Sequence, residues 1–199
     1  PNMLRDQITR FYMPGNMETT HRGEPKAFGA FYLSSPHRIL VDEVHPLSIQ
    51  SGLTHHEIFH ALDDSASGII ATNDLWANSS HGSDYLAHYT RSPLNVVGVR
   101  SSRPTGFART YGTGSIDEDQ ATVGTALISS YSEIMRQSDN DPVLFQKILM
   151  AKALLYRQSD GRMDDQFWLD HANGATIDQA YWAERTETGI VSQEIRDMA

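Results

Sequence analysis

Cysteine is absent from the 199-residue chain, which excludes a disulfide framework, a cysteine-based metal site and a thiol nucleophile. Any bound metal must therefore use histidine and carboxylate ligands. No apolar run approaches the roughly 18–20 residues that span a bilayer, so we expect no membrane span. Basic residues are also few: 16 Lys and Arg against 25 Asp and Glu leave a net charge of −9. Nucleic-acid phosphates attract the opposite charge, so we expect no nucleic-acid partner.

Two short segments predict a β-hairpin, an aromatic-rich strand at 27–33 and a second strand at 38–44. Residues 1–26 are polar and are expected to be irregular. After Pro46 the apolar spacing changes to that of a helix, which we place at about 52–64. Residues 65–110 should be mostly loop. Further helices are predicted at 117–137, from the Asp141–Pro142 cap onward, and as short pieces at 84–90, 164–172, 176–185 and 190–197.

The helix predicted at 52–64 contains His56-Glu57-x-x-His60. Residues i and i+4 share one helix face one turn apart, so the two imidazoles can bind one ion. His55 lies about 100° round the helix from His56 and is a poor chelating partner for His60. The spacing is typical of zinc hydrolases and indicates His56 and His60 as metal ligands. The alternative is a helix whose histidines are exposed or satisfied in the core, with no metal.

Glu57 lies beside the first of these ligands and can reach a metal-bound water without binding the metal. Zinc lowers the pKa of its bound water, and a nearby carboxylate can take the proton before hydroxide attacks a polarised carbonyl. We therefore expect Glu57 to act as the general base of a hydrolytic reaction.

A catalytic zinc site also needs a third protein ligand and one open position. The metzincin extension is excluded, because Ala66 stands where that class requires a histidine. Glu118 is the best candidate, since it opens the next strong helix. Asp117 and Asp119 compete with it for this role. An ordinary first-turn acid, favoured by the helix dipole, is the other interpretation of Glu118. Small residues on its helix face (Ala121, Thr122 and Thr125) would allow close packing against the histidine helix.

These residues resemble the gluzincin metallopeptidases, in particular the catalytic domain of anthrax lethal factor and related small secreted peptidases. The likeness covers His56-Glu57-x-x-His60-Ala61-x-Asp63-Asp64 and Thr110-Tyr111-Gly112, with Glu118 seven residues after the tyrosine. It implies that Glu118 is the third zinc ligand and that Tyr111 hydrogen-bonds the oxyanion of the tetrahedral intermediate. Weaker alternatives for the oxyanion role are Tyr85, His88 and Tyr89.

The resemblance also implies a zincin-like α+β fold, with a small N-terminal β-sheet lobe that carries the HExxH helix and a helical C-terminal lobe. Segments 29–32 and 38–42 look like the two strands that precede the site helix in many gluzincins. An extended peptide typically adds to the edge strand of that sheet. The implied function is a zinc-dependent endopeptidase with one Zn²⁺ ion and a peptide or protein substrate. A secreted or extracellular location is expected.

Thr122 departs from the gluzincin pattern, which usually has Asp or Glu four residues after the third ligand to orient a ligand histidine. Asp63 or Asp64 could supply a carboxylate instead. The departure leaves open a catalytically degenerate, zinc-stabilised binding module. A metal-dependent hydrolase of a non-peptide substrate is a second alternative.

The length favours a single domain over residues 1–199. We expect a strand-bearing lobe over 1–64 that ends with the site helix. A loop-rich, then helical lobe over 65–199 should face it across a cleft. The sequence does not determine the oligomeric state, and a monomer is the default expectation.

Overall fold

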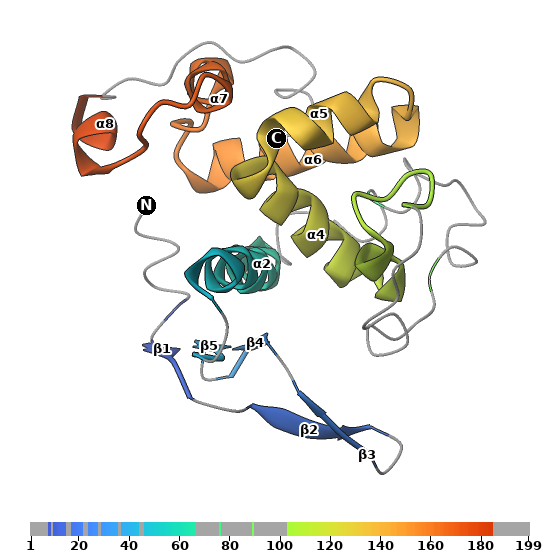
Figure 1. Ribbon diagram of the computed structural model, residues 1–199. Coiled ribbons are helices and arrows are strands. Elements are labelled where there is room, and N and C mark those ends of the chain that lie inside the picture. Colours follow the sequence, from blue (N-terminus) through green and yellow to red (C-terminus); the bar gives the residue numbers. More distant parts are fainter. Residues whose placement is uncertain are drawn as a thin grey trace.

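A computed structural model describes residues 8, 10–14, 17–21, 24–27, 29–35, 37–43, 46–66, 76, 89 and 103–184. A small three-stranded mixed sheet in the N-terminal part is followed by a mostly helical region (Figure 1). The expected α+β class and the order of its parts are therefore confirmed. Within the described ranges, no helix has the length and apolar character needed to cross a membrane.

The predicted hairpin is formed by β4 (Ala30–Leu33) and β5 (Arg38–Val41), which are antiparallel with Phe31 opposite Leu40. A third strand, β1 (Arg10–Tyr12), pairs with β5 in parallel. The order in this sheet is β1-β5-β4, so β4 lies at its edge.

A separate two-stranded antiparallel hairpin is formed by β2 (Glu18–His21) and β3 (Glu24–Ala27). The prediction that residues 1–26 are irregular is thus wrong for β1, β2 and β3. These strands are only 3 or 4 residues long, and all three side chains of β1 are exposed. Such short strands show no clear alternation of buried and exposed positions, which is the signal that sequence reasoning uses.

Helix α2 (Leu47–Ala66) lies between the sheet and the other helices (Figure 1). Its Leu53 and Ile58 pack against the buried side chains of the sheet, whereas Phe59 belongs to the main helical core. The helix begins at Leu47 rather than at about residue 52, because it starts directly after Pro46, whose carbonyl accepts a hydrogen bond from the Ile49 N–H at 2.8 Å.

The C-terminal region packs around one apolar core that includes Leu127, Leu144 and Trp168. The predicted helix at 117–137 is divided at Ser130, whose φ of −151° is not helical. The helix predicted after Asp141 is confirmed, and the Asp141 carboxylate accepts from the Leu144 N–H at 3.0 Å. The elements are η3 (Thr110–Gly114), α4 (Ile116–Ser129), α5 (Tyr131–Ser138), α6 (Pro142–Gln158), α7 (Asp165–Ala172) and α8 (Gln179–Glu184). The predicted pieces at 84–90 (apart from Tyr89) and 190–197 lie outside the described residues.

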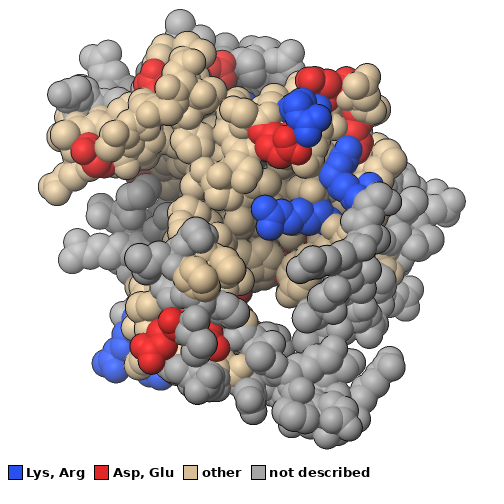
Figure 2. Space-filling model, in the orientation of Figure 1, with Lys and Arg blue, Asp and Glu red and all other residues tan. Residues whose placement is uncertain are grey.

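Charged side chains lie in small groups of both signs on the face shown in Figure 2. One exposed pair is Arg136 and Glu133 of α5, with Nη2 and Oε1 2.7 Å apart. Exposed pairs of this kind contribute little to stability, because water and salt screen their charges. The fold therefore depends on its buried apolar side chains much more than on surface charge.

Helices α2 and α4 meet at Gly124. A Cβ added there would overlap the ring of Phe59, whose side chain is buried. Because glycine has no side chain, α4 can approach α2 closely at this position. The sequence predicts a close approach through Ala121, Thr122 and Thr125, but Gly124 is not among the residues expected to provide it.

Gly124→Ala is expected to destabilise the protein by about 1–3 kcal/mol, because the Phe59 ring must move to admit the methyl group. Gly52→Ala, in α2, is the matched control, since an added Cβ there meets nothing within 4 Å. It should stabilise the protein by about 0.5–1 kcal/mol through helix propensity. Urea denaturation of both variants measures the difference. Equal effects at the two glycines would contradict the close packing at Gly124.

Candidate metal centre

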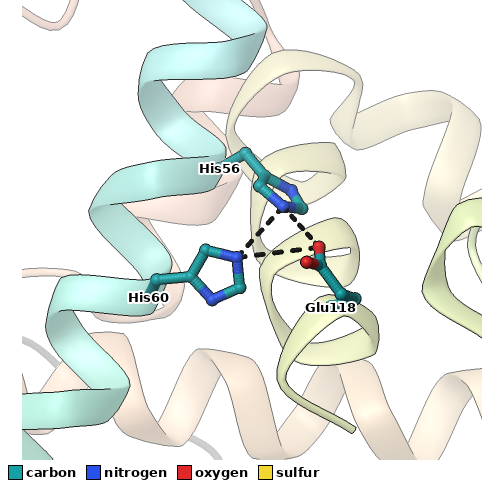
Figure 3. A group of neighbouring side chains, drawn as sticks. All are labelled: His56, His60 and Glu118. Atoms are coloured by element: carbon teal, nitrogen blue, oxygen red, sulfur yellow. Dashed lines mark hydrogen bonds and ion pairs between the residues drawn. The ribbon is translucent and has the colours of Figure 1, made fainter. Parts of the chain in front are cut away.

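His56 and His60 project from the same face of α2, and the carboxylate of Glu118 points toward them from the first turn of α4 (Figure 3). The two histidine Nε2 atoms lie 3.2 Å apart. Oε2 of Glu118 lies 2.8 Å from Nε2 of His56 and 3.6 Å from Nε2 of His60. His56 and Glu118 are 62 positions apart in the sequence, and with His60 they place three donor atoms around one point.

The start of α4 is set by Ser115, whose side chain accepts a hydrogen bond from the Glu118 N–H at 3.2 Å. A serine at this position satisfies one of the free backbone donors of the first helical turn. Because Glu118 lies in that turn, the cap holds its backbone opposite the histidine face of α2.

The spacing of the three donor atoms suits a small tetrahedral ion. Ligands bound to zinc at about 2.0–2.1 Å in tetrahedral geometry lie about 3.3–3.4 Å from one another. The observed separations of 2.8, 3.2 and 3.6 Å lie on both sides of that value. Two imidazoles and one carboxylate also form a ligand set that zinc accepts. His56, His60 and Glu118 are thus a group that could hold a metal ion.

The charges of this group stabilise one another. Burial alone would raise the pKa of Glu118, but hydrogen bonds and charge from His56 and His60 lower it to about 2. Burial also opposes the charged form of His60, yet the hydrogen bond to Glu118 and the nearby negative charges raise the pKa of His60. The ionised form of Glu118 and the protonated form of His60 thus stabilise each other.

Zinc binding is expected to weaken as the pH falls through the raised pKa of His60, because the metal must displace the imidazole proton. Glu118 is already ionised throughout this range and adds no pH dependence. Competition with a chelator of known affinity, from about pH 5 to pH 8, measures the effect. As the pH is lowered, the zinc affinity should begin to fall while the pH is still above 6.5, the ordinary pKa of histidine. An affinity that is constant over the range would contradict the role of His60.

Glu57 lies next to the ligand set on α2, with 6% of its surface exposed. Burial raises the pKa of its carboxyl group, while the charges of His60 and His56 act in the opposite direction. A hydrogen bond from the backbone N–H of Tyr32, in β4, also stabilises the carboxylate. Buried carboxylates with raised pKa values near a possible metal site are typical of general bases.

Tyr111, in η3, contacts the ligand group from outside α2. The centroid of its ring is 5.7 Å from that of His56. Burial, the negative charges of Glu118 and Glu57, and a hydrogen bond to Glu118 all raise the pKa of Tyr111. Its hydroxyl therefore keeps its proton at neutral pH and can donate a hydrogen bond near the ligand atoms.

The two acids that compete with Glu118 are placed differently. Asp119 is fully buried, and its Oδ2 lies 2.5 Å from the Nζ of Lys147 in α6. Asp117 is exposed. Within the described ranges, neither belongs to the group that could hold a metal ion.

The remaining residues that the sequence singles out lie in different surroundings. Tyr89 is buried and its hydroxyl donates to Asp119 at 2.9 Å. Thr122 is buried, and no described residue hydrogen-bonds its Oγ1. His55 is half-buried, and burial lowers its pKa. Tyr85, His88 and the side chains of Asp63 and Asp64 lie outside the described residues.

No protein-family model, curated protein or solved structure matches this chain. The likeness to the gluzincins therefore depends on the site residues themselves. The metal-ligand group is the part of that likeness for which the structure provides geometry.

Lys147 is not among the residues that the sequence predicts for the site, but it is fully buried and bonds to Asp119, the residue after Glu118. A signal was present, because Leu144, Ile148 and Ala151 form the apolar stripe of α6 and Lys147 stands within it. A lysine inside an apolar stripe indicates a buried partner, since buried lysines are almost always paired.

Proposed function

We propose that the protein is a zinc-dependent endopeptidase of the gluzincin type. The observation that carries the proposal is the convergence of His56, His60 and Glu118, with Glu57 beside the group on α2 and Tyr111 against it from η3. These are the parts that metal-assisted hydrolysis of an acyl bond requires: three ligands, a base and a donor for the oxyanion.

His56, His60 and Glu118 would hold the zinc ion and leave one position open. When bound, zinc supplies a water of lowered pKa and polarises a carbonyl oxygen. The carboxylate of Glu57 accepts the proton of the attacking water and passes it to the leaving amine. Its burial favours both transfers, because a raised pKa brings it closer to neutral pH.

The hydroxyl of Tyr111 donates a hydrogen bond to the substrate oxygen as negative charge develops there. The raised pKa of Tyr111 keeps the donor proton in place. Such a bond accelerates the reaction because it is stronger in the transition state than in the bound substrate.

Strand β4 provides a surface for an extended peptide. The Asp42 N–H donates to the Gly29 carbonyl at 2.8 Å across the β4–β5 pair, next to the facing residues Ala30 and Val41. Bonded and non-bonded pairs alternate along antiparallel strands, so the backbone groups of Ala30 and Tyr32 point away from β5, toward the outer edge of β4. Because the Tyr32 N–H already bonds to Glu57, a peptide would pair with β4 through the backbone groups of Ala30, next to the proposed general base. A peptide added to this edge would therefore lie beside the ligand group.

A zinc-stabilised binding module is the second candidate, and Thr122 favours it. No carboxylate stands at this position to orient a ligand histidine, and in the described chain the Thr122 hydroxyl has no partner. Such a module would bind zinc and peptides without turnover.

The location outside the cell and the single-domain organisation stay predictions.

Cleavage of a mixed peptide library tests the proposal. The protein is stripped with a chelator, divided, and one portion is restored with one equivalent of zinc. Mass spectrometry should detect new peptide termini only in the restored portion. Zinc uptake without cleavage would favour the binding module and contradict the peptidase. Cleavage that persists in the stripped portion would contradict a metal-dependent mechanism.

A further inference from the structure

Asp119 connects the metal group to the helical core. It follows Glu118 in the first turn of α4 and is fully buried. Successive helix residues are rotated by about 100°, so the two carboxylates leave α4 in different directions. Oδ2 of Asp119 accepts hydrogen bonds from three side chains: Lys147 Nζ at 2.5 Å, Trp76 Nε1 at 2.9 Å and Tyr89 OH at 2.9 Å.

Lys147, in α6, also holds the chain before η3. Its Nζ donates to the carbonyl of Gly106 at 2.6 Å and lies 4.1 Å from the ring centroid of Phe107. The Gly106 N–H donates to Asp141, the N-cap of α6, at 2.8 Å. Gly106 has a φ of 82°, a backbone conformation that glycine adopts without strain. Both polar groups of Gly106 are therefore fixed to α6.

Gly106 and Asp119 are thus two anchor points on α6. The segment between them carries two site residues, Tyr111 and Glu118. Gly112 packs directly on the second anchor, because a Cβ added there would lie 3.2 Å from both Cα and Oδ1 of Asp119. A displacement of Asp119 would therefore move η3 together with the first turn of α4. The first of these movements would displace the Tyr111 side chain, and the second would displace the Glu118 carboxylate.

Stability alone is a poor explanation for this ion pair. Removing two charges from water is costly, and buried pairs can often be replaced by apolar residues with no loss of stability. Burial acts against both charges here, since it raises the pKa of Asp119 and lowers that of Lys147. What an apolar pair cannot provide is a set of directed bonds that fixes two backbone segments relative to α6.

The geometry points to Lys147 as a positioning residue for the metal centre. Through Asp119 it holds the Glu118 carboxylate against the histidine pair of α2. Through Gly106 it holds η3, and with it the Tyr111 hydroxyl. The Lys147 ammonium has no lone pair for a metal, so it acts on the ligand group through Asp119 and Gly106. This role rests on the proposed function, because it concerns the same site.

Lys147→Met tests the role, and Lys152→Met is the matched control. Lys152 is a second buried lysine of α6, but its Nζ donates to the hydroxyl of Tyr131, in α5, at 2.9 Å. Affinities for Zn²⁺ and Co²⁺ and the visible absorption of bound Co²⁺ are measured for wild type and both variants. Lys147→Met should bind both metals about 10–100-fold more weakly, with an altered Co²⁺ spectrum. Lys152→Met should match the wild type. Wild-type affinity and spectrum in Lys147→Met would overturn the proposal.

The double variant Lys147→Met/Asp119→Asn guards against loss of folding, because it leaves no unpaired buried charge. The amide oxygen introduced by Asp119→Asn can still accept hydrogen bonds from Trp76 and Tyr89. The double variant should fold and still show the weakened metal binding, since the link to α6 is gone. Recovery of wild-type affinity would overturn the proposal, because the defect would then come from the uncompensated charge alone.

Failure of the proposed function would be recognised separately. If the wild type binds neither metal, the peptidase proposal is wrong, and positioning is then measured in the metal-free protein. Nuclear Overhauser contacts between the rings of His56 and Tyr111 report their 5.7 Å approach. Their loss in Lys147→Met and retention in Lys152→Met would support the positioning role. Their retention in both variants would overturn it.

Discussion

Replacing Glu57 with glutamine is expected to lower kcat for peptide hydrolysis by about 100–10,000-fold, with zinc still bound. The amide has nearly the same size and shape as the carboxylate, so it fits the buried position of Glu57. It cannot accept the proton of the attacking water. Because Glu57 lies outside the ligand group, its replacement should leave the zinc content at the wild-type value.

Steady-state kinetics on one cleaved peptide and zinc analysis of the same samples measure both effects. Glu133→Gln is the control, because Glu133 is an exposed glutamate of α5 paired with Arg136. It should retain wild-type kcat and zinc content. Near wild-type turnover in Glu57→Gln would remove Glu57 as the general base. Loss of zinc in this variant would instead indicate that Glu57 helps to hold the metal.

Tyr111→Phe is expected to reduce kcat by about 10–1000-fold, with KM little changed and zinc content unaffected. The phenylalanine keeps the ring beside His56 and removes only the hydroxyl. A hydrogen bond that forms mainly in the transition state lowers the barrier and does little for substrate binding. The effect should therefore be confined to kcat.

Tyr12→Phe provides the control for this experiment. Tyr12 is an exposed residue of β1, and β1 and β4 form the two opposite edges of the sheet. The control should retain both kinetic constants. Unchanged kcat in Tyr111→Phe would move the oxyanion role to another residue, with Tyr85 and His88 as the next candidates. A rise in KM alone would make Tyr111 a substrate-binding residue.

The ligand pair on α2 could be predicted because its geometry is local. His56 and His60 are one helical turn apart, and the helical period alone places them on one face. The hairpin of β4 and β5 is local in the same sense, since a short turn joins its strands. The start of α6 could also be read directly from Asp141 and Pro142.

Features that depend on distant parts of the chain are harder to predict from the sequence. β1 pairs with β5, whose residues begin 28 positions later, as with Arg10 and Arg38. Lys147 finds Asp119 across 28 residues of sequence. Neither partner changes the local pattern of the other. Glu118 is a partial exception. Its place at the start of a strong helix predicts the ligand role, and the resemblance to the gluzincins adds its spacing from Tyr111.

The packing of α4 on α2 shows a third kind of limit. A stripe of small residues on α4 indicates that some helix can approach it, but it does not identify the position of contact. Gly124 is that position, because the Phe59 ring fills the space above it. Shape complementarity between two side chains is a property of the folded pair and leaves no separate trace in either segment.

Zinc stoichiometry in the wild type and in His56→Ala bears most directly on the metal centre. Both proteins are stripped with a chelator, dialysed against equal free zinc and analysed for metal per chain. The wild type should hold one zinc ion per chain, and His56→Ala should hold far less, because one of three ligands is gone. Equal zinc in the two proteins, or no zinc in the wild type, would contradict a metal centre formed by His56, His60 and Glu118.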